Sequence, residues 1–251
     1  MKVVLPIAGR GSRFLKEGIT TPKPLIPVLG KPMVQRAIES VPWVPHSDFI
    51  FIARRDHEEK HGLVTKLKKL LGDKITVIYT PEVTEGAACT VLLAKDYINS
   101  DEDILIMDTD HYFVSDLQKQ TKRRPKNLKG LILVFEDDDP KWSFTKINKK
   151  GWVVEIAEKK PISKYANVGA YYFSHGHDFV WAAHRMIKKG LKVNNEYYVA
   201  PVYNQMIERG DRLGISVVSQ MWEMGTPADV KYFEENFRRQ HVQKSRKRAL
   251  V

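Results

Sequence analysis

The chain has 251 residues, of which 43% are apolar, and a formal net charge of +11. This length suits one large α/β domain or two small ones, with enough apolar residues for a core. No window holds the roughly 18 apolar residues of a membrane span, and the beginning of the chain lacks a signal-peptide pattern. The single cysteine, Cys89, excludes an internal disulfide, fits buried packing and favours a reducing compartment, so we expect a cytoplasmic protein.

The positive charge is concentrated in two runs. Residues 119–129 hold six Lys/Arg and no acid, residues 238–248 hold six more, and the remainder of the chain is nearly neutral. Such runs are typical of solvated surface or a tail, and contact with a polyanion or a membrane surface is the alternative. Both runs lack the interleaved aromatic residues of a nucleic-acid groove, so we expect no nucleic-acid partner.

The first 110 residues alternate between short apolar strands and helical patterns, which is typical of βαβ units. The predicted strands are 2–8, 49–54, 75–79 and 104–107. The predicted helices are about 33–40, 57–71 and 87–98. Strands that are almost uninterrupted in their apolar residues favour a buried parallel sheet.

The pattern changes after residue 125. The predicted elements are a strand at 130–135, a hairpin with arms near 143–148 and 152–157, a strand at 168–173, helices near 177–189 and 196–209, a strand at 213–218 and a helix from about 227. No repeat or low-complexity linker is present, which favours one domain over 1–251, with halves at about 1–125 and 126–237 and a basic tail at 238–251. We predict an α/β fold, a three-layer α/β/α sandwich with a mixed, mostly parallel Rossmann-like sheet and a smaller hairpin and helical half.

The first strand runs into a basic glycine turn, Gly9–Arg13. Glycines let the backbone approach an anion, N–H groups point at it, and basic side chains neutralise it. The rigid segment Pro22–Pro24 would hold Lys23 at a fixed place, so Arg13 and Lys23 would offer two cations to a triphosphate. The turn is neither a P-loop nor a dinucleotide fingerprint, since Phe14 stands where the latter requires glycine. Taken alone, it is explained equally well as an ordinary turn after a strand.

Six ordered blocks between residues 5 and 229 resemble the sugar-phosphate nucleotidyltransferase family. The first block, residues 5–33, is similar to the family's Gly-x-Gly-[Ser/Thr]-Arg loop and Pro-Lys-Pro segment. The other blocks are Thr84–Ala88, Met107–Asp110, Glu158–Pro161, Val168–Phe173 and Glu223–Pro227. The sequence of residues 84–94 and 201–207 is most similar to the branch of the family associated with bacterial capsule or surface polysaccharide genes.

The resemblance implies transfer of a nucleoside monophosphate from CTP, UTP or dTTP to a phosphorylated acceptor, with release of pyrophosphate. A sugar 1-phosphate is the default acceptor, and a small acceptor resembling phosphocholine or phosphoglutamine, used with CTP, is the alternative. The implied cofactor is Mg²⁺, with Mn²⁺ as a substitute, and the oligomeric state stays open, a homo-oligomer included. Two other classes also stay open, a nucleotide-sensing domain of the same fold and a nucleic-acid binder that uses the basic runs.

The resemblance also assigns roles to individual residues. The implied catalytic residues are Arg13, Lys23, Asp110 and Lys159. The implied nucleotide-binding residues are Pro6, Ala8, Gly9, Gly11, Ser12, Arg13, Lys23, Thr80, Glu85, Gly86, Ala87 and Asp108. The implied acceptor-binding residues are Lys159, Lys160, Gly169, Asn195, Glu196 and Tyr197.

The implied metal ligands are Asp110 and Glu223. Asp108 would lie on the same side as Asp110 if the strand continued, and is otherwise a cap or turn residue. Glu223 stands where many relatives carry Asp, so the carboxylate is kept with a longer reach. Asp229 is expected in an exposed first helical turn, and His111 is a weaker candidate for contact with phosphates. The sequence shows no Cys/His ligand cluster, so we do not expect zinc.

The acceptor side leaves more alternatives. One of Lys159 and Lys160 would bind the acceptor phosphate while the other is solvated. The segment Asn195–Tyr198 is predicted to open a helix, where it either contacts the acceptor or only caps the helix and fills the core. Trp142 and Trp222 either line the acceptor pocket or belong to the core.

Overall fold

The structure is a computed structural model that describes residues 1–248, with side chains described as far as residue 237. A nine-stranded sheet forms its centre, with β10-β9-β11-β6-β1-β4-β5 in order and with β8 and β12 attached beyond β11. Its parallel first part consists of β1 (Lys2–Pro6), β4 (Phe49–Arg54), β5 (Thr76–Thr80) and β6 (Ile104–Met107). These strands are nearly all apolar because both faces of the sheet are covered.

The second half of the chain extends the same sheet. Its strands are β8 (Leu128–Glu136), β9 (Ser143–Ile147), β10 (Val153–Glu158), β11 (Tyr165–Phe173) and β12 (Arg212–Val217). Strand β11 pairs antiparallel with both β6 and β8, while β12 lies parallel to β8. The predicted hairpin is confirmed as β9 and β10, which turn at Asn148–Gly151.

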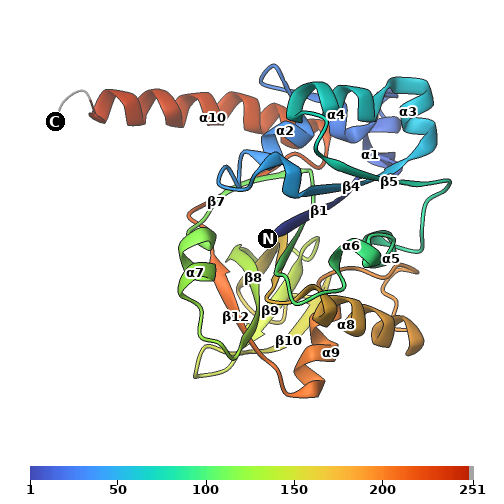
Figure 1. The fold of residues 1–251 in the computed structure, drawn as a ribbon. Coiled ribbons are helices and arrows are strands. Elements are labelled where there is room, and N and C mark those ends of the chain that lie inside the picture. The colour runs from blue at the N-terminus through green and yellow to red at the C-terminus, as the bar shows by residue number, and fades with distance from the viewer. Residues whose placement is uncertain (249–251) are drawn as a thin grey trace.

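Helices cover both faces of the sheet (Figure 1). Val34 of α2 and Leu67 of α4 pack with Leu5 on one face, whereas Val91 of α5 and Phe179 of α8 pack on the other. The helices are α1 (Ser12–Leu15), α2 (Met33–Ile38), α3 (Arg55–His61), α4 (Leu63–Leu71), α5 (Ala87–Leu92), α6 (Lys95–Ile98), α7 (Leu117–Arg123), α8 (Gly176–Lys188), α9 (Val202–Arg209) and α10 (Pro227–Arg248). Two 3₁₀ turns lie at Lys23–Leu25 and His46–Asp48. The predicted three-layer α/β/α fold with a mixed sheet is confirmed, and within residues 1–248 no helix is long and apolar enough to cross a membrane.

Three predicted helices differ from those in the structure. The helix expected at 57–71 is broken into α3 and α4 at Gly62, which has φ 60°. The helix expected at 87–98 is likewise divided into α5 and α6. The helix expected at 196–209 begins only at Val202, because Asn195 has φ 64° and Pro201 restricts the backbone of the residue before it. The segment Asn195–Tyr198 therefore does not open a helix.

Two small sheets and α7 were not predicted. The first small sheet pairs β2 (Pro27–Val28) with β3 (Lys31–Pro32). The second pairs β7 (His111–Val114) with β13 (Gln220–Glu223), so that Glu223 lies opposite His111. This pairing brings a late segment of the chain beside the end of β6.

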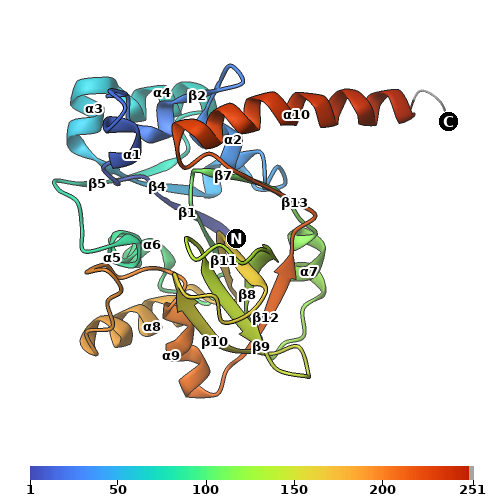
Figure 2. The same cartoon turned by 180° about the vertical axis from the view of Figure 1, so that it is seen from behind.

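The basic run 238–248 forms the second part of α10, which projects from the body of the molecule (Figure 2). Residues 249–251 of the predicted tail lie outside the described residues.

Candidate active site

A cavity of about 610 Å³ opens where β1 and β6 end, and segments from both halves of the chain line it. Ligands of open α/β sheets bind at such carboxyl ends of strands. The sequence-predicted residues that line the cavity are Pro6, Gly9, Gly11, Ser12, Arg13, Lys23, Ala87, Asp108, Asp110, His111, Trp142, Lys159, Gly169, Glu196, Tyr198 and Glu223.

The glycine turn and Lys23 form one wall of this cavity. Gly11 has φ 63°, and a Cβ there would lie 3.6 Å from the Cβ of Lys23, so turn and lysine are packed together. Phe14, which replaces the glycine of a dinucleotide fingerprint, is buried with Trp222 and Phe233 and anchors α1 below the turn. Because this packing fixes the turn and α1, Arg13 and Lys23 are held facing the cavity.

Three charged side chains converge around Gly225. A Cβ on Gly225 would lie 3.1 Å from Glu223 Oε1, 3.3 Å from Arg13 Nη1 and 3.4 Å from Asp110 Oδ2. The amide of Met224 donates to the carbonyl of Asp110 at 2.7 Å and holds the two segments together. Two carboxylates beside an open cavity are the donor set that Mg²⁺ accepts, together with waters and phosphate oxygens. The residues present therefore fit a divalent metal.

Each of these carboxylates is paired with a lysine. Lys23 Nζ lies 2.5 Å from Asp110 Oδ2, and Lys141 Nζ lies 2.6 Å from Glu223 Oε2. The His111 ring adds a contact of 3.3 Å between its Nδ1 and Asp110 Oδ1. The two carboxylates thus already attract cations.

The pKa values of Asp108 and Asp110 are shifted in opposite directions. Strand β6 ends at Met107, and the turn that follows directs both carboxyl groups into the cavity. Burial and the neighbouring Asp110 carboxylate raise the pKa of Asp108 to about 8. Burial alone would also raise the pKa of Asp110, but His111 and Lys23 hold that pKa well below its usual range. Asp110 is therefore the ionised member of the pair at neutral pH.

The acceptor side is built by the turn after β8, by β10 and by the segment before α9. Lys159 has φ 54°, and its Nζ lies 3.0 Å from the hydroxyl oxygen of Tyr198. Trp142 lines the cavity and packs its ring on Phe135 at 5.3 Å between centroids. Trp222 lies instead in the buried cluster against α10.

Seven predicted residues are not among those that line this cavity, Ala8, Thr80, Glu85, Gly86, Lys160, Asn195 and Tyr197. Gly86 is pressed against the backbone of Tyr197, where a Cβ would lie 2.5 Å from the Tyr197 nitrogen. Glu85 is paired with Lys192 at 2.8 Å, and the Tyr197 side chain is buried. Their predicted contacts with nucleotide or acceptor stay predictions.

Two other assignments concern residues beside the site. Asp229 lies in the first turn of α10 and is half-buried, not exposed as expected. Thr226 caps the helix, because its hydroxyl oxygen accepts from the Asp229 amide at 3.1 Å and its hydroxyl donates to the Asp229 carboxylate at 2.6 Å. Burial raises the pKa of the Cys89 thiol, which fits packing and not a nucleophile.

Several residues that line the cavity were not predicted from the sequence, notably Lys141, Ser143, Asn167 and Tyr171, whereas Tyr198 belongs to the predicted segment Asn195–Tyr198. Asn167 is 3% exposed and accepts a hydrogen bond from the Thr145 hydroxyl at 2.6 Å. Its Nδ2 has no hydrogen-bond partner among the described residues, so this donor remains for a ligand. A single polar residue in the otherwise apolar strand Tyr165–Phe173 is the signal that would have found it.

Residues 2–236 match the family model described as Nucleotidyl transferase, so the chain belongs to that family. It is 25% identical to the bifunctional protein GlmU of Methanococcus aeolicus, over 92% of this chain and 53% of the relative. It is 24% identical to the low-salt glycan biosynthesis nucleotidyltransferase Agl11 of Haloferax volcanii, over 92% of this chain and 64% of the relative. The chain spans about half the length of the bifunctional relatives that it matches.

Solved structures share the fold over nearly the whole chain. A nucleoside-diphosphate-sugar pyrophosphorylase from Vibrio cholerae has a TM-score of 0.80 at 25% identity, covering 93% of this chain and 99% of that one. A putative glucose-1-phosphate thymidylyltransferase from Bacillus anthracis has a TM-score of 0.76 at 23% identity, with 94% of each chain covered.

Proposed function

We propose that this protein transfers a nucleoside monophosphate from CTP, UTP or dTTP to a phosphorylated acceptor, a sugar 1-phosphate by default, and releases pyrophosphate. The observation that carries the proposal is the convergence of Asp110, Glu223 and Arg13 around Gly225, beside Lys23 and a cavity lined by both halves. The family membership and the likeness to a nucleoside-diphosphate-sugar pyrophosphorylase support it.

The chemistry requires positive charge and alignment more than proton transfer. An acceptor phosphate oxygen attacks the α-phosphorus while the bond to pyrophosphate breaks, so anionic groups are forced together. The turn Gly9–Arg13 and Lys23 would hold the triphosphate, and Lys159 would receive the acceptor phosphate. Asp110 and Glu223 would hold Mg²⁺ or Mn²⁺, which supplies charge neutralisation at the reacting phosphate.

The acceptor would lie between β10 and the segment before α9. The Asn167 Nδ2 group, which has no partner among the described residues, and the carboxylate of Glu158, which accepts a hydrogen bond from Ser143, suit sugar hydroxyls. A role in capsule or surface polysaccharide biosynthesis is supported by the sequence resemblance and by the glycan biosynthesis relative of Haloferax volcanii. The single cysteine supports a cytoplasmic location.

A second candidate is a cytidylyltransferase that acts on a small non-sugar acceptor. The cavity is lined by the acidic residues Glu158 and Glu196 together with the aromatic rings of Trp142 and Tyr198. Acidic groups beside aromatic faces suit a cationic amine such as the one in phosphocholine. This candidate uses the same nucleotide side of the site, with CTP as the donor, and differs in its acceptor.

The test is a matrix of nucleoside triphosphates against phosphorylated sugars and phosphorylated amines, with pyrophosphate release as the readout. Asp110→Asn serves as the inactive control, and Asp229→Asn removes a carboxylate that does not line the cavity. Activity with one sugar phosphate supports the first candidate, and activity confined to CTP with an amine supports the second. Nucleotide binding without pyrophosphate release from any pair would instead indicate a nucleotide-sensing domain.

A further inference from the structure

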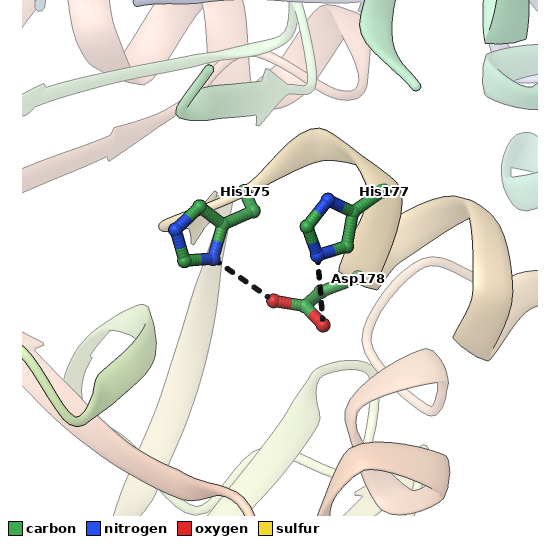
Figure 3. Close-up of side chains that lie close together, drawn as sticks. All are labelled: His175, His177 and Asp178. Carbon is green, nitrogen blue, oxygen red and sulfur yellow. Dashed lines mark hydrogen bonds and ion pairs between the residues drawn. The ribbon is translucent and has the colours of Figure 1, made fainter. Parts of the chain in front are cut away.

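A second cluster of ligand-type side chains lies at the start of α8. His175, His177 and Asp178 each offer one atom, and these atoms all lie within 4.8 Å of one another. Figure 3 shows both imidazole rings directed at the carboxylate of Asp178. The separations are 3.3 Å from His175 Nδ1 to Asp178 Oδ2 and 3.7 Å from His177 Nε2 to Asp178 Oδ1. None of the three is among the residues that line the active-site cavity.

These separations suit a small divalent cation. Ligand atoms about 2.0–2.2 Å from a tetrahedral Zn²⁺ lie roughly 3.3–3.6 Å from each other. Asp178 is 3% exposed, which fixes its carboxylate, whereas the two imidazoles are partly exposed and leave an entry path. Imidazole and carboxylate ligands together favour zinc, nickel or cobalt over magnesium.

The ammonium of Lys129 shows that the cluster already attracts a cation. Lys129 Nζ lies 3.3 Å from His175 Nδ1 and 3.8 Å from Asp178 Oδ2. With Nδ1 unprotonated, His175 accepts a hydrogen bond from this ammonium, and that is also the form that ligates a metal, whereas a protonated Nδ1 would donate to Asp178 Oδ2 instead. The Lys129 side chain is 31% exposed and can therefore move into solvent.

The second histidine is oriented by a carboxylate outside the cluster. Asp101 Oδ1 lies 3.2 Å from His177 Nδ1, so that a proton on Nδ1 leaves Nε2 free to face Asp178. Carboxylates commonly orient metal-bound histidines in this way. The rings of His175 and His177 also stack at 5.2 Å with 6° between their planes, which fixes their mutual geometry.

Other charged groups limit how a cation can be held. Arg209 Nη2 lies 2.5 Å from Asp178 Oδ1 and also contacts Asp211, so this oxygen is already engaged. Asp178 Oδ2 is the oxygen that remains for an ion, with His175 Nδ1 beside it at 3.3 Å. His177 Nε2 faces the engaged oxygen Oδ1 at 3.7 Å, and it reaches an ion at Oδ2 because the ligand atoms of the three residues lie within 4.8 Å of one another. A bound cation and Lys129 therefore compete for the same position.

We propose that His175, His177 and Asp178 form a binding site for a divalent transition-metal ion of the zinc class, separate from the catalytic metal site. The ion takes the place of the Lys129 ammonium and joins His175, the residue before α8, to the first turn of α8. With three protein ligands, a water completes the coordination. This proposal departs from the sequence-based expectation that zinc is not bound, although its three ligands lie within the four-residue run 175–178.

The experiment measures Zn²⁺ and Co²⁺ binding to the full chain without a histidine tag, after treatment with EDTA and dialysis. An Asp110→Asn background weakens the catalytic carboxylate site, so that the remaining ion is counted by elemental analysis and by Co²⁺ absorption. We expect one ion per chain that is lost in His175→Ala/His177→Ala and kept in His184→Ala, an exposed histidine of the same helix. Equal binding by these two variants would overturn the proposal.

Lys129→Met provides a second measurement that does not remove a ligand. Loss of the competing ammonium should tighten Zn²⁺ binding about tenfold, whereas unchanged or weaker binding would contradict the shared position. Zinc should also raise the melting temperature of the unmodified protein but not that of the double histidine variant, since an ion bound only by the folded state stabilises it. Circular dichroism establishes that each variant is folded.

Discussion

Asp110 and Asp178 are two carboxylates with similar electrostatic surroundings, but only Asp110 faces the active-site cavity. Each is held ionised by basic neighbours, Lys23 and His111 for Asp110, Arg209 and Lys129 for Asp178. Asp110, however, faces a cavity of about 610 Å³, whereas Asp178 is closed in by α8 and α9. Charge pairing therefore does not by itself make a substrate site.

Two glycines, Gly225 and Gly169, leave the open space around Asp110 and its neighbour Asp108. Gly225 leaves the space in which Asp110, Glu223 and Arg13 converge, and Gly169, with φ 82°, leaves space for Asp108. A Cβ at Gly169 would lie 2.5 Å from Asp108 Oδ2. The proposed site therefore requires the absence of a side chain at Gly225 and Gly169 as well as its charged groups.

The largest expected effect is that of Asp110→Asn, which breaks the proposed metal site and leaves Lys23 without its partner. Loss of one of two metal ligands should lower the rate of pyrophosphate release by about 10³-fold or more. Steady-state assays at saturating Mg²⁺ measure this, with Asp229→Asn close to the activity of the unmodified protein. Full activity of Asp110→Asn would contradict the assignment of the metal ligand.

Gly225→Ala should have the next largest effect. The backbone of Gly225 does not have a positive φ, so alanine is tolerated there, but its Cβ would crowd Glu223 Oε1 at 3.1 Å and Arg13 at 3.3 Å. A displacement of this size should reduce kcat/KM about 10²-fold with little change in stability.

Gly214→Ala in β12 is the matched control for Gly225→Ala. Its Cβ would contact Leu131 at 3.1 Å, away from the cavity, so only stability should change. Equal activity losses in the two variants would show that crowding alone, and not the site, explains the result.

The sequence best predicted which residues line the cavity where those residues are close together along the chain. Arg13 and Lys23 come from one opening segment, and Asp110 directly follows a strand. Lys141 was missed because nothing local distinguishes it from other turn residues. Asn167 stands out as a polar residue in an apolar strand, but that signal does not say which side of the sheet it faces, and the fold directs both residues into the cavity. The contacts of Glu223 depend on the four-residue strands β7 and β13, which are too short for a periodic pattern.

The same limit applies to the segment around Asn195. Its polar residues before an apolar pattern resemble a helix start, but the positive φ at Asn195 and the position of Pro201 prevent a helix there. The run His175–Asp178 is visible in the sequence, but the contacts of its Asp178 with Lys129 of β8 and Arg209 of α9 are not. Secondary-structure propensities depend on residues that are neighbours in the sequence, whereas the contacts of Lys129 and Arg209 with Asp178 join distant segments.

Arg209→Met tests the buried carboxylate of Asp178. It should change the free energy of unfolding but not the rate of the reaction. Burial would raise the pKa of Asp178, but the hydrogen bond and charge of Arg209, with Lys129, hold that pKa below its usual range. A lowered pKa stabilises the folded state above the unfolded pKa near 4, and this contribution is lost as the pH falls through the folded value. We therefore expect the variant to lose about 2 kcal/mol at pH 7 and to approach the unmodified protein in acid.

Urea unfolding at pH 7 and at pH 3 measures this difference between the variant and the unmodified protein. Activity per folded molecule should be unchanged, because Arg209 does not line the cavity. A constant difference in the free energy of unfolding at both pH values would mean that Arg209 acts through packing on Trp181, over whose ring it lies at 4.1 Å.

Lys141→Met should give the smallest effect, and it makes the two carboxylate sites directly comparable. Lys141 is 44% exposed, so its pair with Glu223 contributes less than about 1 kcal/mol to stability. Its ammonium nevertheless occupies a position beside a proposed metal ligand, as Lys129 does beside Asp178. Removing it should tighten Mn²⁺ binding to the free protein about threefold, which electron paramagnetic resonance of free Mn²⁺ measures. If Mn²⁺ binds more weakly to Lys141→Met, Lys141 does not compete with the metal but positions Glu223 to receive it.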